Sequence, residues 1–495
     1  MLSSTAMAQD DPCIEEPCYL DAAGEPQDPA RDYDRLVARR SPRYLIAGIE
    51  LTAMIVGGAV WFGLDPDHQV ASWDLPSLQQ RFSLEALRFD NNSFDINWLG
   101  HPFNGVWYHI YSRANDLSLP ASVGFGLATS LAWEYVLEFN HTASVNDLLV
   151  TTGAGVAIGE FFYWMGRYFT SAPENQRLAT RWTFGIWQSA HRDDDNRGAP
   201  LDELGFSSHI WHRFDLVTGL ALGEVTRSER ERPATPRVQQ LSLRAEFAAL
   251  PGYLRPGVFG ASFAQGNLTA LALDARLGDG GAGFDLQATT TLLGYHWQRL
   301  TRDGGRAATV GVAIGSTYRR HTTDSWFDRV GILHLPGPAL SGHLRGPSWH
   351  LEVSVAGHGD FASLDAAAYP AWQAANPDVV GKTILARQRY YFGWGVSGSA
   401  RALLTTPHLR FGAAWFGGRY RSQQGLDRSQ EAVEYDVPVA DRVMDRAAWV
   451  DLEPLAGRLI VRARLERRVR HNRVDRSFRA SKTLRQFSLL VGAVF

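Results

Sequence analysis

The chain of 495 residues has almost no lysine and almost no net charge. Only Lys382 and Lys482 are lysines, so nearly all of the 49 basic residues are arginine, and 52 acidic residues bring the net charge to -3. A nucleic-acid-binding domain needs a basic surface that attracts phosphates. Because the charges balance, we exclude nucleic acid as a partner.

Cysteine is equally scarce, with Cys13 and Cys18 in "DPCIEEPC" as the two cysteines of the chain. Their spacing does not match a zinc-binding or thioredoxin-like redox pair. The alternatives are a small disulfide, formed in an oxidising compartment, or two free thiols in an N-terminal tail. We favour the disulfide.

The chain also lacks the overall apolarity of a helical inner-membrane protein, because its mean hydropathy is -0.20. It nevertheless has 12% aromatic residues, including 16 tryptophans. Tryptophan and tyrosine are typical anchors at membrane interfaces. This combination favours a membrane protein that does not cross the bilayer mainly through apolar helices.

The N-terminus carries the small-residue motif Ala6-Met7-Ala8 within "STAMAQDD", which is typical of a signal-peptide cleavage site. Only five residues precede it, so we expect the signal peptide to be longer than the part contained in this sequence. Coincidence is the alternative, because such tripeptides are common. Cys13 follows Asp-Pro, not a lipobox, so we expect export without a lipid anchor, with residues 1–40 as the exported tail.

The C-terminal part alternates between apolar and polar residues, as in the closing stretch "LRQFSLLVGAVF". Alternation of period two indicates strands between an apolar and a wet environment. We count about twelve such strands between residues 206 and 495, each close to the length of a tilted membrane strand. The terminal aromatic Phe495 resembles the signal read by the barrel assembly machinery. We therefore predict a monomeric, up-and-down outer-membrane β-barrel with loops at 360–386 and 422–444; a soluble β-protein is the alternative.

Residues 41–190 instead predict a helical domain. The apolar run 44–64 is long enough to cross a bilayer, but Glu50 interrupts it. We expect this helix to pack on protein, inside the barrel lumen or against the periplasmic end of the barrel; an uncleaved inner-membrane anchor is the alternative.

Two further helices are predicted, from Ser118 to about residue 139 and from Ser144 onward, because both serines can cap a helix. Ser144 and Asp147 resemble a capping box. Small residues at positions 155 and 159 favour close packing of these two helices. Buried acids need counter-charges. We therefore expect three acids to lie in the seam between these two helices, with Arg113, Arg167 or histidines as their counter-charges. The three acids are Glu134, Glu138 and Glu160.

The segment "NNSFDINWLGHPFNGVWYHIYSRAND…SLAWEYVLEF…SVNDLLVTTGAGVAIGE" resembles an uncharacterised bacterial family, a domain of unknown function found in predicted outer-membrane proteins. The resemblance covers about residues 88–170. It departs from the family pattern at "SRAND" and "TASVND". It implies an outer-membrane location and no established activity. The matching positions are Asn97, His101, Pro102, Gly105, Tyr108, Arg113, Trp133, Glu134, Glu138, Asn146, Asp147, Gly159 and Glu160.

These residues give two hypotheses for function. The first is a structural barrel, or one that allows gated passage, whose helical domain plugs the lumen or docks on the barrel. The second is an envelope enzyme acting on lipid or lipopolysaccharide, with an acid–base set drawn from the acids and a histidine. We favour a structural polar network. The candidate catalytic residues are Glu134, Glu138, Asp147, Glu160 and His101, and the candidate binding residues are Arg113, Asn146 and Arg167.

No metal or cofactor is expected from the sequence, because no H-x-x-x-H spacing joins His101, His109 and His141. Nucleotide-binding and phosphate-loop fingerprints are missing as well. The partners that we expect are outer-membrane lipid and the barrel assembly machinery.

Overall fold

The computed structural model describes residues 13, 17–37, 41–64, 87–138, 142–172, 178–191, 200–226, 237–278, 281–323, 326–377, 379, 383–426, 437–455 and 459–494. The cleavage motif 6–8 and the terminal Phe495 therefore lie outside the described residues. Cys13 and Cys18 form a disulfide, with their Cα atoms 5.4 Å apart.

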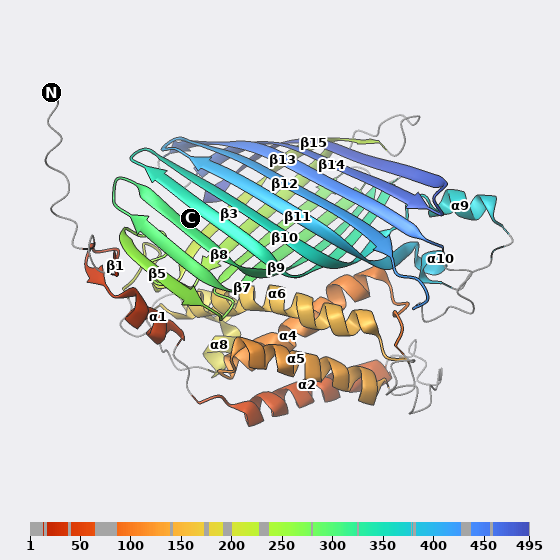
Figure 1. Cartoon of the computed structure of the whole chain (residues 1–495), viewed down its shortest axis with the longest axis horizontal. Coiled ribbons are helices and arrows are strands. Elements are labelled where there is room, and N and C mark those ends of the chain that lie inside the picture. The colour runs from red at the N-terminus through yellow and green to blue at the C-terminus, as the bar shows by residue number, and fades with distance from the viewer. Residues whose placement is uncertain are drawn as a thin grey trace.

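Twelve antiparallel strands close into a barrel (Figure 1). The ring closes where β15 pairs with β3, from Thr483–Thr226 to Val494–Asp215, and where β7 pairs with β8. This ring confirms the prediction of a twelve-stranded barrel. Its strands are β3 (Trp211–Thr226), β4 (Arg237–Ala248), β6 (Leu268–Gly278), β7 (Gly281–Leu300), β8 (Gly305–Thr323), β9 (Trp326–Gly346), β10 (Trp349–Asp365), β11 (Tyr390–Thr405), β12 (Leu409–Ser422), β13 (Val439–Leu455), β14 (Leu459–Val474) and β15 (Phe478–Val494).

One irregularity interrupts the ring next to β7. The short strand β5 (Gly257–Phe263) pairs with residues 294–300 of β7, whereas β6 pairs with residues 281–291 of the same strand edge. Residues 264–267 therefore form a kink between two collinear strand segments. Two N-terminal strands, β1 (Cys18–Leu20) and β2 (Pro26–Gln27), extend the sheet from β5. The sequence did not predict β1, β2 or β5.

The two rims of the barrel differ. Connections of a few residues, such as 301–304 and 347–348, lie on one rim, which we call the turn rim. The long connections 366–389 and 423–438 lie on the opposite rim, the loop rim, and the first contains α9 (Tyr369–Ala375) and α10 (Ile384–Gln388). In single-chain bacterial barrels the short turns face the periplasm and the long loops face outward.

The lumen is crossed by ion pairs between strands that are not neighbours. On β7, Asp285 points inward and pairs with Arg468 of β14 at 2.8 Å, whereas the alternate residues Leu286 and Ala288 point outward. A cavity of about 480 Å³ lies among the inward-facing side chains. The other cross-lumen pairs include Arg213–Glu352 at 2.8 Å, Arg276–Glu466 at 3.2 Å, Arg319–Asp445 at 2.5 Å, Arg470–Asp328 at 2.7 Å and Lys482–Asp365 at 3.0 Å.

The N-terminal helices pack on the outer wall of this barrel, and α2 lies farthest from it (Figure 1). Thr290, which shares the outward face of β7 with Leu286 and Ala288, donates a hydrogen bond to the carbonyl of Ala157 at 2.9 Å. We call six elements the helical layer: α2 (Tyr44–Leu64), η1 (Ile96–Gly100), α4 (His101–Ala114), α5 (Leu119–Ala132), η2 (Trp133–Leu137) and α6 (Val145–Thr170). Shorter helices flank it: α1 (Pro29–Val37), α7 (Leu178–Phe184) and α8 (Ile186–His191).

The position of the helical layer corrects one expectation. The predicted helix 44–64 forms as α2, but it lies neither in the lumen nor at the end of the barrel. The helical layer docks on the side wall and does not plug the lumen, which the charged side chains of the barrel occupy instead. By length and composition, Val145–Thr170 qualifies as a membrane-crossing helix, and Tyr44–Val60 is a shorter apolar segment.

Candidate functional site

The candidate acids of the helical layer fall into two separate clusters. Asp147 and Glu160 are 13 residues apart on α6, so about 20 Å of helix separates them. Glu160 lies in the middle of the helical layer. Asp147 lies at its end near the loop rim, and Glu134 lies at that end too.

The cluster around Glu160 is a closed ion-pair network. Its carboxylate lies 2.7 Å from Nε of Arg113 and 2.6 Å from Nε2 of His109, and all three side chains are buried. Arg113 also donates a hydrogen bond to the carbonyl of Gln265, in the kink between β5 and β6, at 3.2 Å. The network therefore fixes α4, α6 and the barrel wall to one another, which is a structural role. Arg167, the other predicted counter-charge, donates instead to the carbonyl of Leu36 at 2.7 Å.

Close approach of α4 and α6 makes this network possible. A Cβ atom on Gly105 would overlap the carbonyl oxygen of Thr151, and one on Gly155 would meet the backbone of Gly105. The small residues at 155 and 159 were expected to pack against the helix that starts at Ser118. That expectation was wrong, because Gly155 and Gly159 face Gly105 and His109 of α4.

At the other end of α6, the helix cap is shared between two helices. Ser144 caps α6, because its Oγ accepts from the backbone N–H of Asp147 at 3.2 Å. In a capping box the third helical residue would accept from the N–H of the cap. Here Glu134 of η2 takes that role, accepting from the Ser144 N–H at 2.7 Å. The carboxylate of Asp147 therefore points elsewhere.

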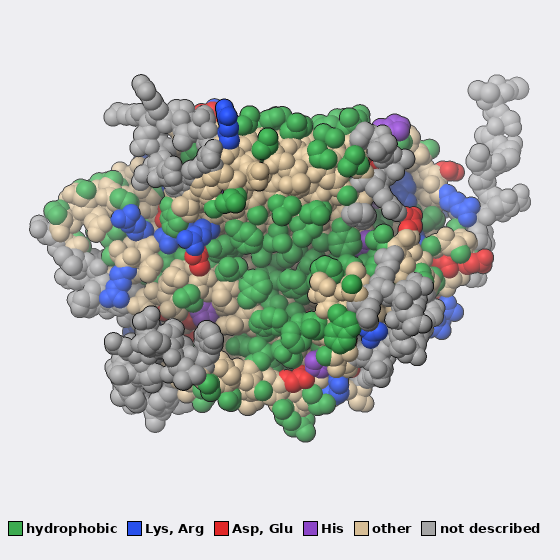
Figure 2. Space-filling model, turned by 180° about the vertical axis from the view of Figure 1, so that it is seen from behind, with side chains coloured by type: hydrophobic (Ala, Val, Ile, Leu, Met, Phe, Trp, Pro, Cys, Tyr) green, Lys and Arg blue, Asp and Glu red, His purple; other side chains and the backbone are tan. Residues whose placement is uncertain are grey.

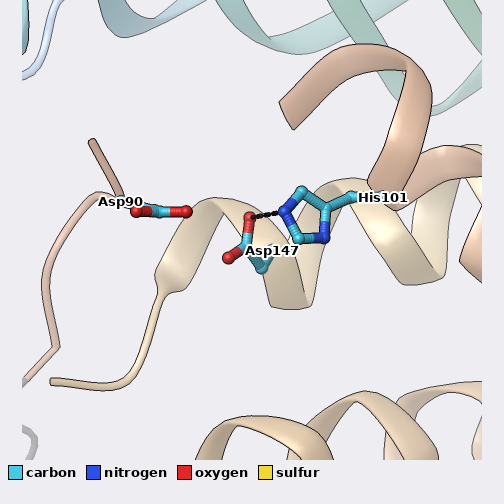
Figure 3. Close-up of side chains that lie close together, drawn as sticks. All are labelled: Asp90, His101 and Asp147. Atoms are coloured by element: carbon cyan, nitrogen blue, oxygen red, sulfur yellow. Dashed lines mark ion pairs between the residues drawn. The ribbon is translucent and has the colours of Figure 1, made fainter. Parts of the chain in front are cut away.

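Asp147 points toward His101 and Asp90, and the three residues come from three different segments (Figure 3). Oδ1 of Asp147 lies 3.3 Å from Nε2 of His101. One ligand atom from each of the three side chains lies within 4.8 Å of the other two. Asp90 and Asp147 are buried, and His101 is mostly buried. We call Asp90, His101 and Asp147 the end cluster.

Amide side chains tie the end cluster to the barrel. Asn146 accepts from the backbone N–H of Asp90 at 2.8 Å and donates to Asp147 at 2.7 Å. Its Nδ2 also lies 3.4 Å from Oδ1 of Asn97, which in turn donates to the hydroxyl of Tyr390 on β11 at 2.9 Å. The predicted site residue Glu138 accepts from the indole N–H of Trp133 at 3.0 Å.

The end cluster has two chemical capabilities. An imidazole nitrogen and two carboxylates are ligands that divalent transition-metal ions accept. The same groups can exchange a proton with a bound substrate, as a general acid or base. Nε2 of His101 is buried and faces the carboxylate of Asp147, so this nitrogen is the one that would act in either role.

Sequence reasoning named His101 and Asp147 but missed Asp90. It looked for ligands at helical spacing, whereas these three residues come from α4, α6 and the segment before η1. Asp90 sits in the stretch "FDNNSFD", where an acid followed by two asparagines signals only a turn. Only the fold brings it to His101.

A family model matches one segment of the chain. Residues 86–186 match the model of a family described as Domain of unknown function (DUF3943). This match confirms the resemblance expected from the sequence, and the matched range contains every residue of the end cluster and of the Glu160 network that lies in the helices. A search of curated proteins found no match to the chain.

Several solved outer-membrane barrels resemble the structure distantly. The translocator domain of the autotransporter NalP from Neisseria meningitidis is 11% identical, with 56% of this chain and 88% of that chain covered and a TM-score of 0.19. The transport unit of the autotransporter AIDA-I from Escherichia coli is 11% identical, with 64% and 99% covered and a TM-score of 0.21. The porin NanC is 10% identical, with 55% and 98% covered and a TM-score of 0.19. At these scores the likeness carries no inference about activity.

Proposed function

We propose that this outer-membrane barrel is a non-conducting anchor that holds the helical layer against its side wall. The observation that carries the proposal is the set of ion pairs joining opposite walls of the lumen, such as Arg213–Glu352 and Arg276–Glu466. Breaking a buried ion pair costs about 3–5 kcal/mol, because it leaves a charge without its partner. Several such pairs would have to open together before a solute could pass.

Conductance of the purified protein in planar lipid bilayers tests this proposal. We expect no steady current through the wild-type protein. The double variant Asp285→Asn/Glu466→Gln removes two acids of the cross-lumen ion pairs and should raise the conductance above that of the wild-type protein. The matched control is Glu224→Gln, because Glu224 is partly exposed near the end of β3. A steady open-channel current through the wild-type protein would overturn the proposal and favour gated passage.

A second candidate function is modification of an envelope lipid or of lipopolysaccharide. The observation that favours it is the end cluster, which brings a histidine and two acids together at the loop-rim end of the helical layer. Under this hypothesis His101 and Asp147 exchange protons with the substrate. Asp90 orients the imidazole of His101 or neutralises its positive charge when it is protonated.

Lipid and glycan analysis of a deletion strain tests this second function. The wild-type gene should restore the parental composition, whereas Asp147→Asn should not, although the variant barrel assembles as judged by its heat-modifiable mobility. Glu224→Gln is the control and should restore the composition fully. An unchanged composition in the deletion strain would remove the enzymatic hypothesis.

We also propose that the protein is exported through a cleaved signal peptide and inserted as a monomer by the barrel assembly machinery. The Cys13–Cys18 disulfide supports passage through an oxidising compartment. The alternating strand β15, which closes the ring against β3, supports recognition of the last strand during assembly. Mass spectrometry of the N-terminus of the mature protein tests the cleavage, and cross-linking of β15 to the machinery tests the insertion.

A further inference from the structure

The outward face of α2 is covered with apolar side chains that no other part of the described chain covers. Leu45 is 77% exposed, Ile49 is 60% exposed, and Val56 and Val60 are each 55% exposed. The opposite face packs on the neighbouring helices, since Ala47 and Leu51 are buried and Gly58 lies against the ring of Trp133. An exposed apolar surface of this extent needs a cover.

The helices have the dimensions of a membrane layer. They run alongside the barrel, so that their ends lie toward its two rims (Figure 1). α2 has 21 residues and α6 has 26, which correspond to about 31 and 39 Å of helix. The hydrocarbon core of a bilayer is about 30 Å thick, and the apolar band of an outer-membrane barrel is about 25 Å tall. Either helix is therefore long enough to cross the core.

The apolar surface of the barrel lies at the same height along the barrel as these helices. Hydrophobic side chains gather in a band across the middle of the molecule, and most charged side chains in view lie toward its two ends (Figure 2). Exposed residues such as Leu220 on β3 and Val396 on β11, at 64% and 63% exposed, belong to the lipid-facing wall. Because α2 lies beside the barrel at the level of this band, a membrane around the band would also surround α2.

The charges within the helical layer fit an apolar surrounding. Its six acidic and basic residues are Glu50, Arg113, Glu134, Asp147, Glu160 and Arg167, and all except Glu50 are buried. Glu50 accepts from Asn115 at 2.6 Å and lies 2.8 Å from Nε2 of His191. Charged groups in a bilayer face protein and are paired there, because an unpaired charge in hydrocarbon is costly. The outward face of α2 carries none of these charges.

We propose that the helical layer lies in the outer membrane beside the barrel, with the outward face of α2 in contact with lipid acyl chains. The occupant is lipid, because the exposed face is apolar over a bilayer's length and continues the level of the barrel's own lipid-facing band. The chain then crosses the membrane four times, in α2, η1–α4, α5–η2 and α6, before it enters β3. The end cluster, at the loop-rim ends of these helices, lies at the level of the lipid headgroups. The proposal rests on the placement of the barrel in the membrane, but not on a non-conducting lumen.

Spin labels on single cysteines test this proposal in the full-length protein reconstituted into phosphatidylcholine vesicles. Cys13 and Cys18 are bonded to each other and do not react with the label. Ile49→Cys and Val56→Cys probe α2, Leu220→Cys is the lipid-facing control on the barrel, and Asp303→Cys in the exposed 301–304 turn is the water-facing control. Collisions with oxygen report lipid, and collisions with a water-soluble nickel chelate report water.

We expect the labels at positions 49 and 56 to collide preferentially with oxygen, with the same ratio of oxygen to nickel collisions as the label at position 220. Nickel collisions at both α2 positions, with position 220 still oxygen-accessible, would overturn the inference while leaving the barrel in the membrane. Dipolar broadening at position 56 would show that a second copy covers α2, which also overturns it. Nickel collisions at position 220 would instead refute the membrane placement of the barrel itself.

Discussion

Glu134 accepts a hydrogen bond from the backbone N–H of Ser144, at 2.7 Å, across the turn between η2 and α6. Ser144 in turn accepts from the N–H of Asp147. The cap of α6 is thus completed by a residue outside the helix. This arrangement leaves the carboxylate of Asp147 available to His101, so the structure of the cap and the chemistry of the end cluster are linked through Glu134.

This link predicts different effects for the two acids. Glu134→Ala removes the acceptor of a buried N–H and should lower the free energy of unfolding of the helical layer by about 1–3 kcal/mol. Glu134→Gln keeps an acceptor oxygen and should have a smaller effect. Asp147→Asn leaves the cap intact and should not lower the stability comparably. Thermal unfolding followed by far-ultraviolet circular dichroism checks the order, and an equal loss in Asp147→Asn and Glu134→Ala would contradict it.

The Glu160 network predicts a larger effect. Glu160→Gln leaves the buried guanidinium of Arg113 without its carboxylate partner, so we expect a loss of about 3–5 kcal/mol in the stability of the helical layer. The matched control is Glu224→Gln, because Glu224 and Arg485 are partly exposed and 3.9 Å apart. Exposed pairs contribute little. Urea unfolding of the two variants in the same detergent compares them, and equal midpoints would refute the structural role of Glu160.

Close packing of α4 on α6 gives a third prediction. Gly105→Ala places a methyl group against the carbonyl of Thr151 and should separate the two helices, breaking the bond between His109 and Glu160. Gly124→Ala on α5 is the control, because a Cβ there meets nothing within 4 Å. Disulfide trapping between cysteines placed on α4 and α6 measures the separation. Trapping that is as efficient in Gly105→Ala as in Gly124→Ala would contradict the proposed seam.

The barrel was predictable because each strand alternates between an apolar and a polar environment. On β7, the order Asp285, Leu286, Gln287, Ala288 gives the direction of each side chain without the fold. The kink at 264–267 was not predictable, because its carbonyls at Gln265 and Gly266 accept from Arg113 of α4 and Trp164 of α6, which are far away in the sequence.

The position of the helical layer could not be read from the strands for a related reason. Leu286 and Ala288 are apolar because they face outward, and a lipid tail or a helix provides an equally apolar cover. The end cluster was only half predictable. His101 and Asp147 stand out as polar residues in apolar helices, whereas Asp90 enters the cluster from a loop. The sequence left Asp147 either as a capping-box acid or as a candidate catalytic residue, and in the structure Glu134 takes the capping-box position.

Docking of the helical layer on the barrel gives the last prediction. The indole of Trp98, in η1, lies on Gly331 of β9, where a Cβ atom would overlap the ring. Gly331→Leu should therefore displace η1 from the wall without preventing strand pairing, because the added side chain points outward from β9. Gly342→Leu, farther along the same strand, is the matched control, since a Cβ there meets nothing within 4 Å.

Limited proteolysis combined with heat-modifiable mobility separates the two parts of the molecule. In Gly331→Leu we expect the barrel to keep its folded mobility while cleavage within residues 87–138 becomes faster than in Gly342→Leu. The physical reason is that Trp98 is 1% exposed and stacks on Phe361. Displacing Trp98 breaks this aromatic contact between η1 and the barrel wall and exposes the segment to the protease. Unchanged cleavage would mean that the Glu160 network and Thr290 hold the layer without Trp98. Loss of the folded barrel band would mean that the barrel needs its helical layer in order to close.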